Sequence, residues 1–284
     1  MKEVFSIEER RAIRMETVQA GRLSIHSGFS LRDGGKSREP FSSLNLGLHV
    51  GDNPLAVLAN RELLARDIGF PLERWVCAEQ VHGTEVVRVS SADAGSGARD
   101  LQTVIKGADG LITTEANLLL ALCYADCVPV YFYTVNPPAV AMLHAGWRGT
   151  VGGGARKMVA ALIRELNLAS AKEIHVIIGP AIGQIDYEVD EHVMNQVFKL
   201  DEELFEPAVQ RRGSGHYLLS LQTLNRTILL QAGVPAEQIK VTAYTTYADP
   251  DLFYSFRRDK GQTGRMIGYI GLKNEGEGHS DSSR

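Results

Sequence analysis

The sequence predicts an α+β fold, with a mixed sheet or two packed sheets covered by outer helices. Three observations support this. Short apolar runs of strand length arrive in pairs before most of the expected helices, rather than in strict alternation with them. Pro137-Pro138 separates two such runs. Neither an internal repeat nor a long linker divides the chain, so we expect one domain over residues 1–284, with a core at about 22–272 and a polar tail at 273–284.

The N-terminal third predicts a strand, a long loop and a helix. Residues 22–29 are typical of a strand, and the polar, glycine-containing segment 41–52 of an ordered loop. Residues 54–68 have helical periodicity, with Asn53 as the N-cap and Gly69 as the stop. We expect Leu55, Leu58, Leu63 and Leu64 to share the buried face of this helix.

The remaining chain continues the mixture of strands and helices. Helices are expected at 155–166, 189–200 and 221–232. Strands are expected at 75–80, 84–89, 109–113, 118–124, 128–134, 139–144, 174–178, 239–244 and 266–272.

Composition excludes several kinds of protein. Hydrophobic residues make up 44% of the chain, charged residues 23%, and the net charge is -4 without a long basic run, which argues against nucleic acid as a partner. The chain has neither an apolar run of membrane-spanning length nor a secretory signal near Met1. Three cysteines do not suggest a disulfide framework. These features predict a cytoplasmic protein that is not embedded in a membrane.

His82, Cys127 and His144 are the strongest candidates for chemistry. Each lies where an expected strand runs into a polar turn. Two imidazoles and one thiol can bind a metal and leave one position open, as catalytic zinc sites do. The same atoms could instead make a cysteine nucleophile with a histidine base. The spacing alone matches no zinc finger, and a buried core cysteine with turn histidines remains an ordinary alternative.

Other polar residues are candidates for binding or proton transfer. The segment 146–154 is glycine-rich and precedes a helix, so its backbone and Arg148 could bind an anion, although a tight turn explains it equally well. Asp126 could orient a ligand imidazole or accept a proton, whereas Asp109 before Gly110 is more typical of a turn. Asn45 and Arg61 are weaker candidates.

Arginines are densest near the C-terminus. Arg257 and Arg258 precede Asp259, and Arg265 follows shortly after. The cluster could receive a phosphate or a carboxylate group. A surface Arg–Asp pair of little energetic weight is the favoured interpretation.

Six segments together resemble the YfiH/YlmD family, also called the laccase-domain or polyphenol oxidoreductase family. The resemblance extends over about residues 25–272, and its second to fourth segments contain the His–Cys–His triplet. The segments are Phe41-Ser42-Ser43-Leu44-Asn45-Leu46-Gly47, Gln80-Val81-His82-Gly83, Ala125-Asp126-Cys127-Val128-Pro129, His144-Ala145-Gly146-Trp147-Arg148-Gly149-Thr150, Ile178-Gly179-Pro180-Ala181-Ile182-Gly183 and Phe256-Arg257-Arg258-Asp259.

The resemblance implies a single α+β domain layered α/β/β/α, similar to the catalytic domain of cytotoxic necrotizing factor. It implies Zn²⁺ on His82, Cys127 and His144. It also implies purine nucleosides and phosphate as substrates, with phosphorolysis of adenosine, inosine, guanosine and methylthioadenosine to the free base and ribose-1-phosphate, and deamination of adenosine. The chain departs from many members by having Gln184 and Ile185 where they have two cysteines.

On this resemblance, Cys127, His144, Asp126 and Arg148 are the expected catalytic residues, and Asn45, Arg61 and Arg148 the expected ligands of phosphate or ribose. Three alternatives stay open: a Cys–His amidase acting on a peptidoglycan precursor, a copper polyphenol oxidase, and a non-catalytic binding protein clipped by zinc. Copper is disfavoured, because such oxidases need many histidine ligands and the chain has eight histidines in all.

Overall fold

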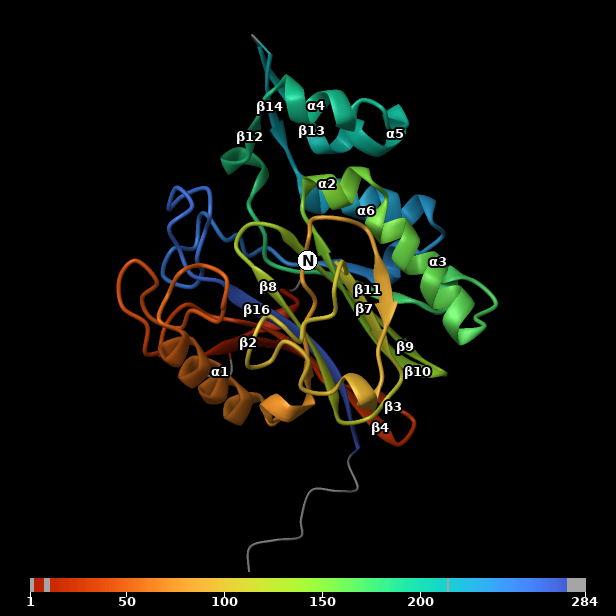
Figure 1. Ribbon diagram of the computed structural model, residues 1–284. Helices are drawn as coiled ribbons and strands as arrows, with labels where there is room; N and C mark the ends of the chain where they lie inside the picture. The colour runs from red at the N-terminus through yellow and green to blue at the C-terminus, as the bar shows by residue number, and fades with distance from the viewer. Residues whose placement is uncertain (1–2, 8–10, 214, 275–284) are drawn as a thin grey trace, which may run out of the picture.

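Two sheets packed face to face form the centre of the molecule. The computed structural model describes residues 3–7, 11–213 and 215–274, and Figure 1 shows the arrangement of its elements. The predicted polar tail lies almost wholly outside these residues. The first sheet has seven strands in the order β1-β2-β4-β16-β8-β5, and β3 also pairs with β4. These strands are β1 (Phe5–Ser6), β2 (Ala12–Met15), β3 (Val18–Ala20), β4 (Leu23–Ser30), β5 (Trp75–Val76), β8 (Leu118–Tyr124) and β16 (Met266–Asn274).

The second sheet has six strands in the order β15-β11-β9-β10-β7-β6. A small third sheet, β12-β14-β13, lies above it with two short helices in Figure 1. The strands of the second sheet are β6 (Val86–Arg88), β7 (Gly110–Thr113), β9 (Val128–Val135), β10 (Pro138–Ala145), β11 (His175–Ile178) and β15 (Ile239–Val241), and those of the third are β12 (Glu188–Val189), β13 (Val209–Gly213) and β14 (His216–Leu219).

Helices cover the outer faces of both large sheets. Helix α1 lies against the seven-stranded sheet, and α3 and α6 lie against the six-stranded sheet (Figure 1). The helices are α1 (Pro54–Ile68), α2 (Trp147–Val151), α3 (Gly154–Leu166), α4 (Glu191–Val197), α5 (Glu202–Phe205) and α6 (Leu221–Gln231). The predicted α+β fold with α/β/β/α layers is therefore confirmed.

Burial on both faces explains the uninterrupted apolar runs. In β8, Leu120 faces the second sheet, whereas Leu119 packs with α1. In β9, Tyr131 faces the first sheet, whereas Phe132 packs under α3 and α6. A strand that is covered on both sides needs apolar residues at every position, so alternation between polar and apolar residues disappears.

Helix α1 has the predicted ends, and its buried face agrees in part with the prediction. Leu64 is buried, and Leu58 and Leu63 are half-buried. The side chain of Asn53 accepts a hydrogen bond from the Leu55 N–H, and Gly69 ends the helix with a φ of 71°. The expected burial of Leu55 is wrong, because this residue is 75% exposed. The buried face includes Asn60 and Arg61, whose polar groups bind loop backbone and could not be recognised from hydrophobic spacing.

The structure adds elements that the sequence did not predict. Strands β1 to β3 extend the first sheet N-terminal to the expected start of the core, and with two to four residues each they are too short to show a strand pattern. The helix expected at 189–200 is limited to Glu191–Val197, with Asp190 as its N-cap. In the described part of the chain, none of the helices has the length and apolarity required to cross a membrane.

Replacing Asn53 by Ala should remove the hydrogen bond to Leu55 N–H and lower the free energy of unfolding by about 1 kcal/mol. Urea unfolding followed by circular dichroism measures this change. Asn53→Asp is the matched control, because aspartate keeps an acceptor oxygen and should retain most of the stability. Equal losses in both variants would contradict the capping role.

Candidate metal centre and its cavity

His82, Cys127 and His144 converge at one end of the two central sheets. One ligand atom from each residue lies within 4.8 Å of the others. The two imidazole rings meet edge to face, with their centroids 4.8 Å apart. Cys127 is half-buried, His144 is buried, and His82 is exposed. The three residues predicted as metal ligands therefore lie together, although they come from distant parts of the chain, and their binding of a metal stays a prediction.

Strand register places Cys127 beside His144. The chain leaves the first sheet at the end of β8, turns at Asp126 with a φ of 86°, and enters the second sheet in β9. Antiparallel pairing of β9 with β10 then puts His144 opposite Pro129. The turn that joins the two sheets thus places the thiol next to the end of β10.

Gly146 leaves the space that the thiol occupies. A Cβ atom on Gly146 would lie 3.0 Å from Cys127 Sγ and 3.3 Å from His82 Cδ2. Its backbone angles are ordinary, with a φ of -69°. Glycine therefore leaves room beside the thiol and the His82 ring, which a larger side chain would crowd, and its backbone freedom is not needed here.

Asp109 holds two of the three ligands in place. Its Oδ1 lies 2.8 Å from His144 Nδ1 and accepts a hydrogen bond from the His82 N–H at 3.0 Å. Its Oδ2 accepts a hydrogen bond from the Gly83 N–H at 2.7 Å. The side chain is completely buried. The interpretation of Asp109 as a turn residue was incomplete, because the same carboxylate also orients the His144 ring.

The site favours a thiolate in the absence of a metal. Burial alone would raise the pKa of Cys127, but His144 and His82 lower it to about 6. Burial alone would lower the pKa of His144, but Cys127 and Asp109 raise it to about 9. Burial would also raise the pKa of Asp109, but hydrogen bonds from His144, Gly83 and His82 lower it below its usual value.

These donors suit a zinc ion. A thiolate and two imidazoles form one face of a tetrahedral zinc shell and leave the fourth position for a substrate or water. With Asp109 on Nδ1 of His144, its Nε2 is the nitrogen that remains for a metal, as in carboxylate–histidine–zinc arrangements. Among the described residues, this is the group of His, Cys, Asp and Glu that could hold a metal ion. A multi-copper centre would require further ligands.

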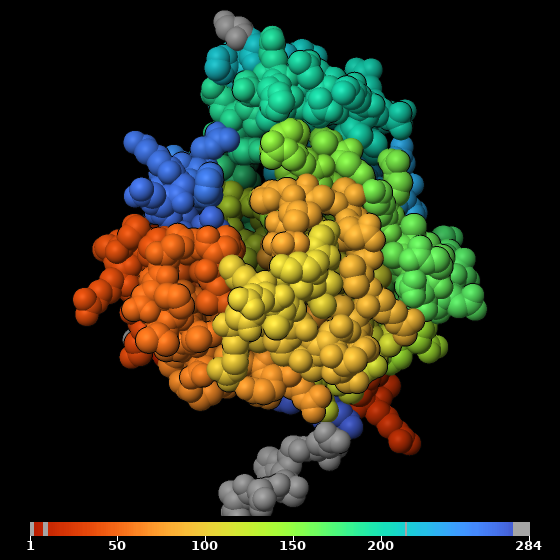
Figure 2. Space-filling model, in the orientation of Figure 1, coloured from red at the N-terminus to blue at the C-terminus, as the bar shows by residue number. Residues whose placement is uncertain are grey.

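The three ligands line a cavity of about 470 Å³. Figure 2 shows the surface hollowed between the blue C-terminal loop, the orange segments and the green and teal segments above them. Trp147, Tyr187 and Phe256 supply aromatic wall, and Arg257 and Arg265 are the arginines of its lining. This volume is within the range of small-molecule sites.

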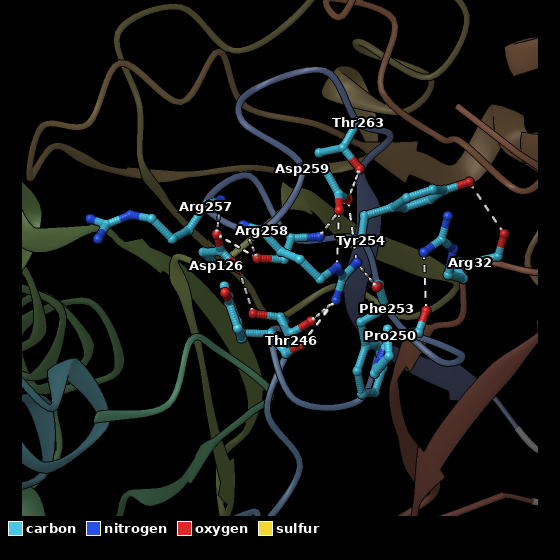
Figure 3. Close-up of polar contacts among 12 residues, drawn as sticks. Arg32, Asp126, Thr246, Pro250, Phe253, Tyr254, Arg257, Arg258, Asp259 and Thr263 are labelled. Carbon is cyan, nitrogen blue, oxygen red and sulfur yellow. Dashed lines mark hydrogen bonds and ion pairs between the residues drawn. The ribbon is translucent and has the colours of Figure 1, made fainter. Parts of the chain in front are cut away.

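Asp126 contacts a different part of the structure from the one we expected. Its Oδ1 accepts a hydrogen bond from the Thr246 hydroxyl at 2.6 Å, and its Oδ2 accepts from Ser255 Oγ and the Arg257 N–H (Figure 3). The carboxylate on His144 is that of Asp109. The prediction that Asp126 orients a ligand imidazole is therefore wrong, and its contacts anchor the loop that carries Arg257.

Asn45 and Arg61 have backbone partners. Asn45 Oδ1 accepts from the N–H groups of Gly47 and Arg265, and its amide donates to Asp52. Arg61 donates to the carbonyl oxygens of Leu46, Gly97 and Ala98. Both side chains are buried, so their described contacts stabilise the loops around the cavity.

Arg148 and the C-terminal arginines are arranged differently from the prediction. Arg148 is exposed and lies over the Trp147 ring, 4.6 Å from its centroid. The predicted Arg–Asp pair is present between Arg258 and Asp259 at 2.9 Å (Figure 3). Arg257 and Arg265 are not part of that pair and line the cavity instead. Their place on the wall could not be inferred from their spacing.

The fold and the site together define a layered α/β/β/α protein whose cavity is lined by a His–Cys–His group that could hold a metal ion. The family described as "Multi-copper polyphenol oxidoreductase laccase" matches residues 26–273, and the chain belongs to this YfiH-type family. It is 45% identical to "Purine nucleoside phosphorylase YlmD" of Geobacillus stearothermophilus, over 97% of this chain and 99% of that protein.

Two further comparisons agree with this membership. The Bacillus subtilis protein called "Purine nucleoside phosphorylase YlmD" is 43% identical over 88% of this chain and 89% of its own length. The crystal structure of YlmD from Geobacillus stearothermophilus superposes with a TM-score of 0.90 at 43% identity, covering 95% of this chain and 99% of that one. The likeness to cytotoxic necrotizing factor stays a prediction.

Asp109→Asn should weaken zinc binding by about 10- to 100-fold, because an amide cannot replace both carboxylate oxygens beside His144 and the turn at His82. Competition with a chromogenic zinc chelator measures the affinity. Asp126→Asn is the matched control, since its carboxylate bonds to the 246–257 loop. A larger effect at Asp126 would contradict this assignment.

Iodoacetamide should alkylate Cys127 of the metal-free protein faster than the other two cysteines at pH 7. The pKa of Cys127 is lowered to about 6, whereas burial raises that of Cys77 to about 11 and raises that of Cys123. Peptide mass spectrometry identifies the labelled residue. Stoichiometric Zn²⁺ should protect Cys127, and labelling that ignores zinc would argue against its ligand role.

Proposed function

We propose that the protein is a zinc-dependent purine nucleoside phosphorylase. The observation that carries this proposal is one cavity that combines the His–Cys–His centre with an aromatic wall and two arginines. The names of the relatives point to the same activity. Adenosine, inosine, guanosine and methylthioadenosine are the proposed nucleosides, and phosphate is the proposed co-substrate.

Each half of the substrate pair has a matching surface. Trp147, Tyr187 and Phe256 offer ring faces or edges to a purine, and base–aromatic stacking tolerates different purines. Arg257 and Arg265 offer guanidinium groups to anionic oxygens. A cavity of about 470 Å³ is large enough to bring a nucleoside and an anion together.

In phosphorolysis, an oxygen of HPO₄²⁻ forms a bond to C1′ of the ribose while the bond from C1′ to N9 of the purine breaks. The electron pair of the broken bond moves to the purine, and the proton of HPO₄²⁻ ends on the purine nitrogen. The products are the free base and ribose-1-phosphate. The protein has to orient the two reactants, which is where much of the rate enhancement of such a reaction arises.

His82, Cys127 and His144 would hold the zinc ion, and bound zinc would supply Lewis-acid chemistry to oxygen atoms in the cavity. Asp109 fixes the orientation of His144 and the turn at His82. The cavity walls limit access of water to the reacting atoms. Asp126 keeps the 246–257 loop in place through three hydrogen bonds, which is the positioning role we propose for it.

Adenosine deamination is a second proposed reaction of the same site. Water adds at C6 of adenosine and ammonia leaves, giving inosine. A mixed set of histidine and cysteine ligands also holds the zinc of base deaminases, which supports this proposal.

A Cys–His amidase is the second candidate function, because Cys127, His144 and Asp109 follow one another as nucleophile, base and orienting carboxylate would. His82 on the other side of the thiol favours metal binding instead. The two functions respond in opposite ways to zinc: it would activate the phosphorylase and block a thiolate nucleophile.

The zinc-loaded protein should convert adenosine and phosphate to adenine and ribose-1-phosphate, and Cys127→Ala should lose both zinc and turnover. Liquid chromatography of the bases, with metal content measured on the same samples, checks both. Absence of any product from nucleosides with zinc bound, with or without phosphate, would contradict the proposal. An amidase activity that rises when zinc is removed would support the second candidate function.

A further inference from the structure

The side of the cavity next to helix α1 carries buried positive charge that lacks a carboxylate partner. Arg61 is 2% exposed and donates hydrogen bonds to the backbone oxygens of Leu46, Gly97 and Ala98. Within the described residues, no carboxylate lies within ion-pair distance of Arg61. A buried guanidinium in this situation creates a strong local positive potential.

Arg265 adds a second cation at the same place. Its Nη1 donates to the carbonyl oxygens of Thr263 and Gly264, and its guanidinium lies 5.5 Å from the centre of the Phe256 ring. It lines the main cavity together with the metal ligands. No carboxylate of the described chain forms an ion pair with Arg265 either, so its charge is available to a ligand.

The thiols of Cys77 and Cys123 do not neutralise these arginines. Burial raises the pKa of Cys77 to about 11 and raises that of Cys123, so both are neutral at pH 7. Glu79, on the same wall, is occupied by Lys106 and by the N–H of Gly107. Arg61 and Arg265 therefore have neither a thiolate of Cys77 or Cys123 nor a free carboxylate of Glu79 as a counterion.

His49 also lies within the electrostatic influence of Arg61 and Arg265. It lines both the main cavity and a smaller one of about 210 Å³ that also includes Arg61 and Cys123. Desolvation, then Arg265 and Arg61, then His144 and His82 lower the pKa of His49 to about 4. Its neutral ring can donate one N–H to an anion.

We propose that Arg265 and His49, with Arg61 behind them, form the subsite that binds inorganic phosphate where the two cavities meet. An oxyanion there balances the charges of Arg61 and Arg265 at once. It also accepts hydrogen bonds from the N–H groups of Arg265 that do not bond to Thr263 or Gly264. This inference rests on the proposed phosphorylase function only for the role of phosphate as co-substrate.

The placement also orients the nucleoside. With phosphate beside Arg265, Trp147 and Tyr187 remain for the purine. The ribose then lies between the phosphate and the purine, in the cavity that His82, Cys127 and His144 also line. Arg148 is exposed, lies over the Trp147 ring, and is not among the residues that line the cavity. The assignment of phosphate to Arg265 therefore competes with the sequence-based prediction of Arg148.

Titration of inorganic phosphate into the zinc-loaded protein by calorimetry tests the subsite directly, without turnover. Arg265→Gln should weaken phosphate binding at least tenfold, and Arg265→Lys should lose less, because lysine keeps the charge but not the fork of donors. Arg148→Gln is the matched control and should bind phosphate within twofold of the wild type. Unchanged binding by Arg265→Gln, or a larger loss in Arg148→Gln, would overturn the proposal.

A second measurement uses the unaltered protein and avoids any folding defect of a variant. Phosphate should protect Arg265, but not Arg148, from phenylglyoxal, as read by peptide mass spectrometry. Equal modification of Arg265 with and without saturating phosphate would overturn the subsite. Phosphate binding that depends on Arg265, without any phosphorolysis, would leave the subsite standing and refute the proposed function alone.

Discussion

The buried carboxylate of Asp109 is the contact on which the rest of the site depends. It joins the turn that carries His82 to the strand that carries His144 through three hydrogen bonds, and it lies directly before β7. An ionised group that is fully buried is costly unless its oxygens are fully bonded. The turn and the imidazole satisfy that requirement, so the same hydrogen bonds that make Asp109 tolerable in the core also bring His82 and His144 together. Stability and function are coupled at this residue.

The third ligand is placed by the contact between the sheets. Cys127 lies in the turn between β8, in the first sheet, and β9, in the second, and this turn is where the chain crosses from one sheet to the other. Packing of Leu120 and Tyr131 in the shared core fixes the two strands relative to each other. Gly146, at the end of β10, then leaves space for the thiol. The meeting of His82, Cys127 and His144 is therefore a consequence of how two sheets pack, and local sequence spacing contains little of that information.

This explains what the sequence could predict. The ends of α1 followed from Asn53 and Gly69, since capping is a local property. The triplet could be recognised only through the segments around it, because its members are far apart in the chain. Asp109 was missed because an Asp-Gly pair has the same local pattern whether or not a distant histidine binds the carboxylate. Arg61 was expected to contact substrate, whereas its hydrogen bonds in the described structure are to loop carbonyl oxygens. Hydrophobic periodicity cannot identify a polar residue on the buried face of a helix.

The positive charge beside the cavity also arises from contacts that stabilise the fold. Arg61 closes the loops at 46 and 97–98 by donating to their carbonyl oxygens, which orders the wall but leaves a positive charge inside the protein. Hydrogen bonds to neutral carbonyls satisfy the donors of a guanidinium without cancelling its charge. The thiols of Cys77 and Cys123 are too weakly acidic in this setting to supply a counterion. An anion bound beside Arg265 would offset the buried positive charge that the folded protein already contains. The charges that favour anion binding at this end of the cavity are therefore placed there by folding.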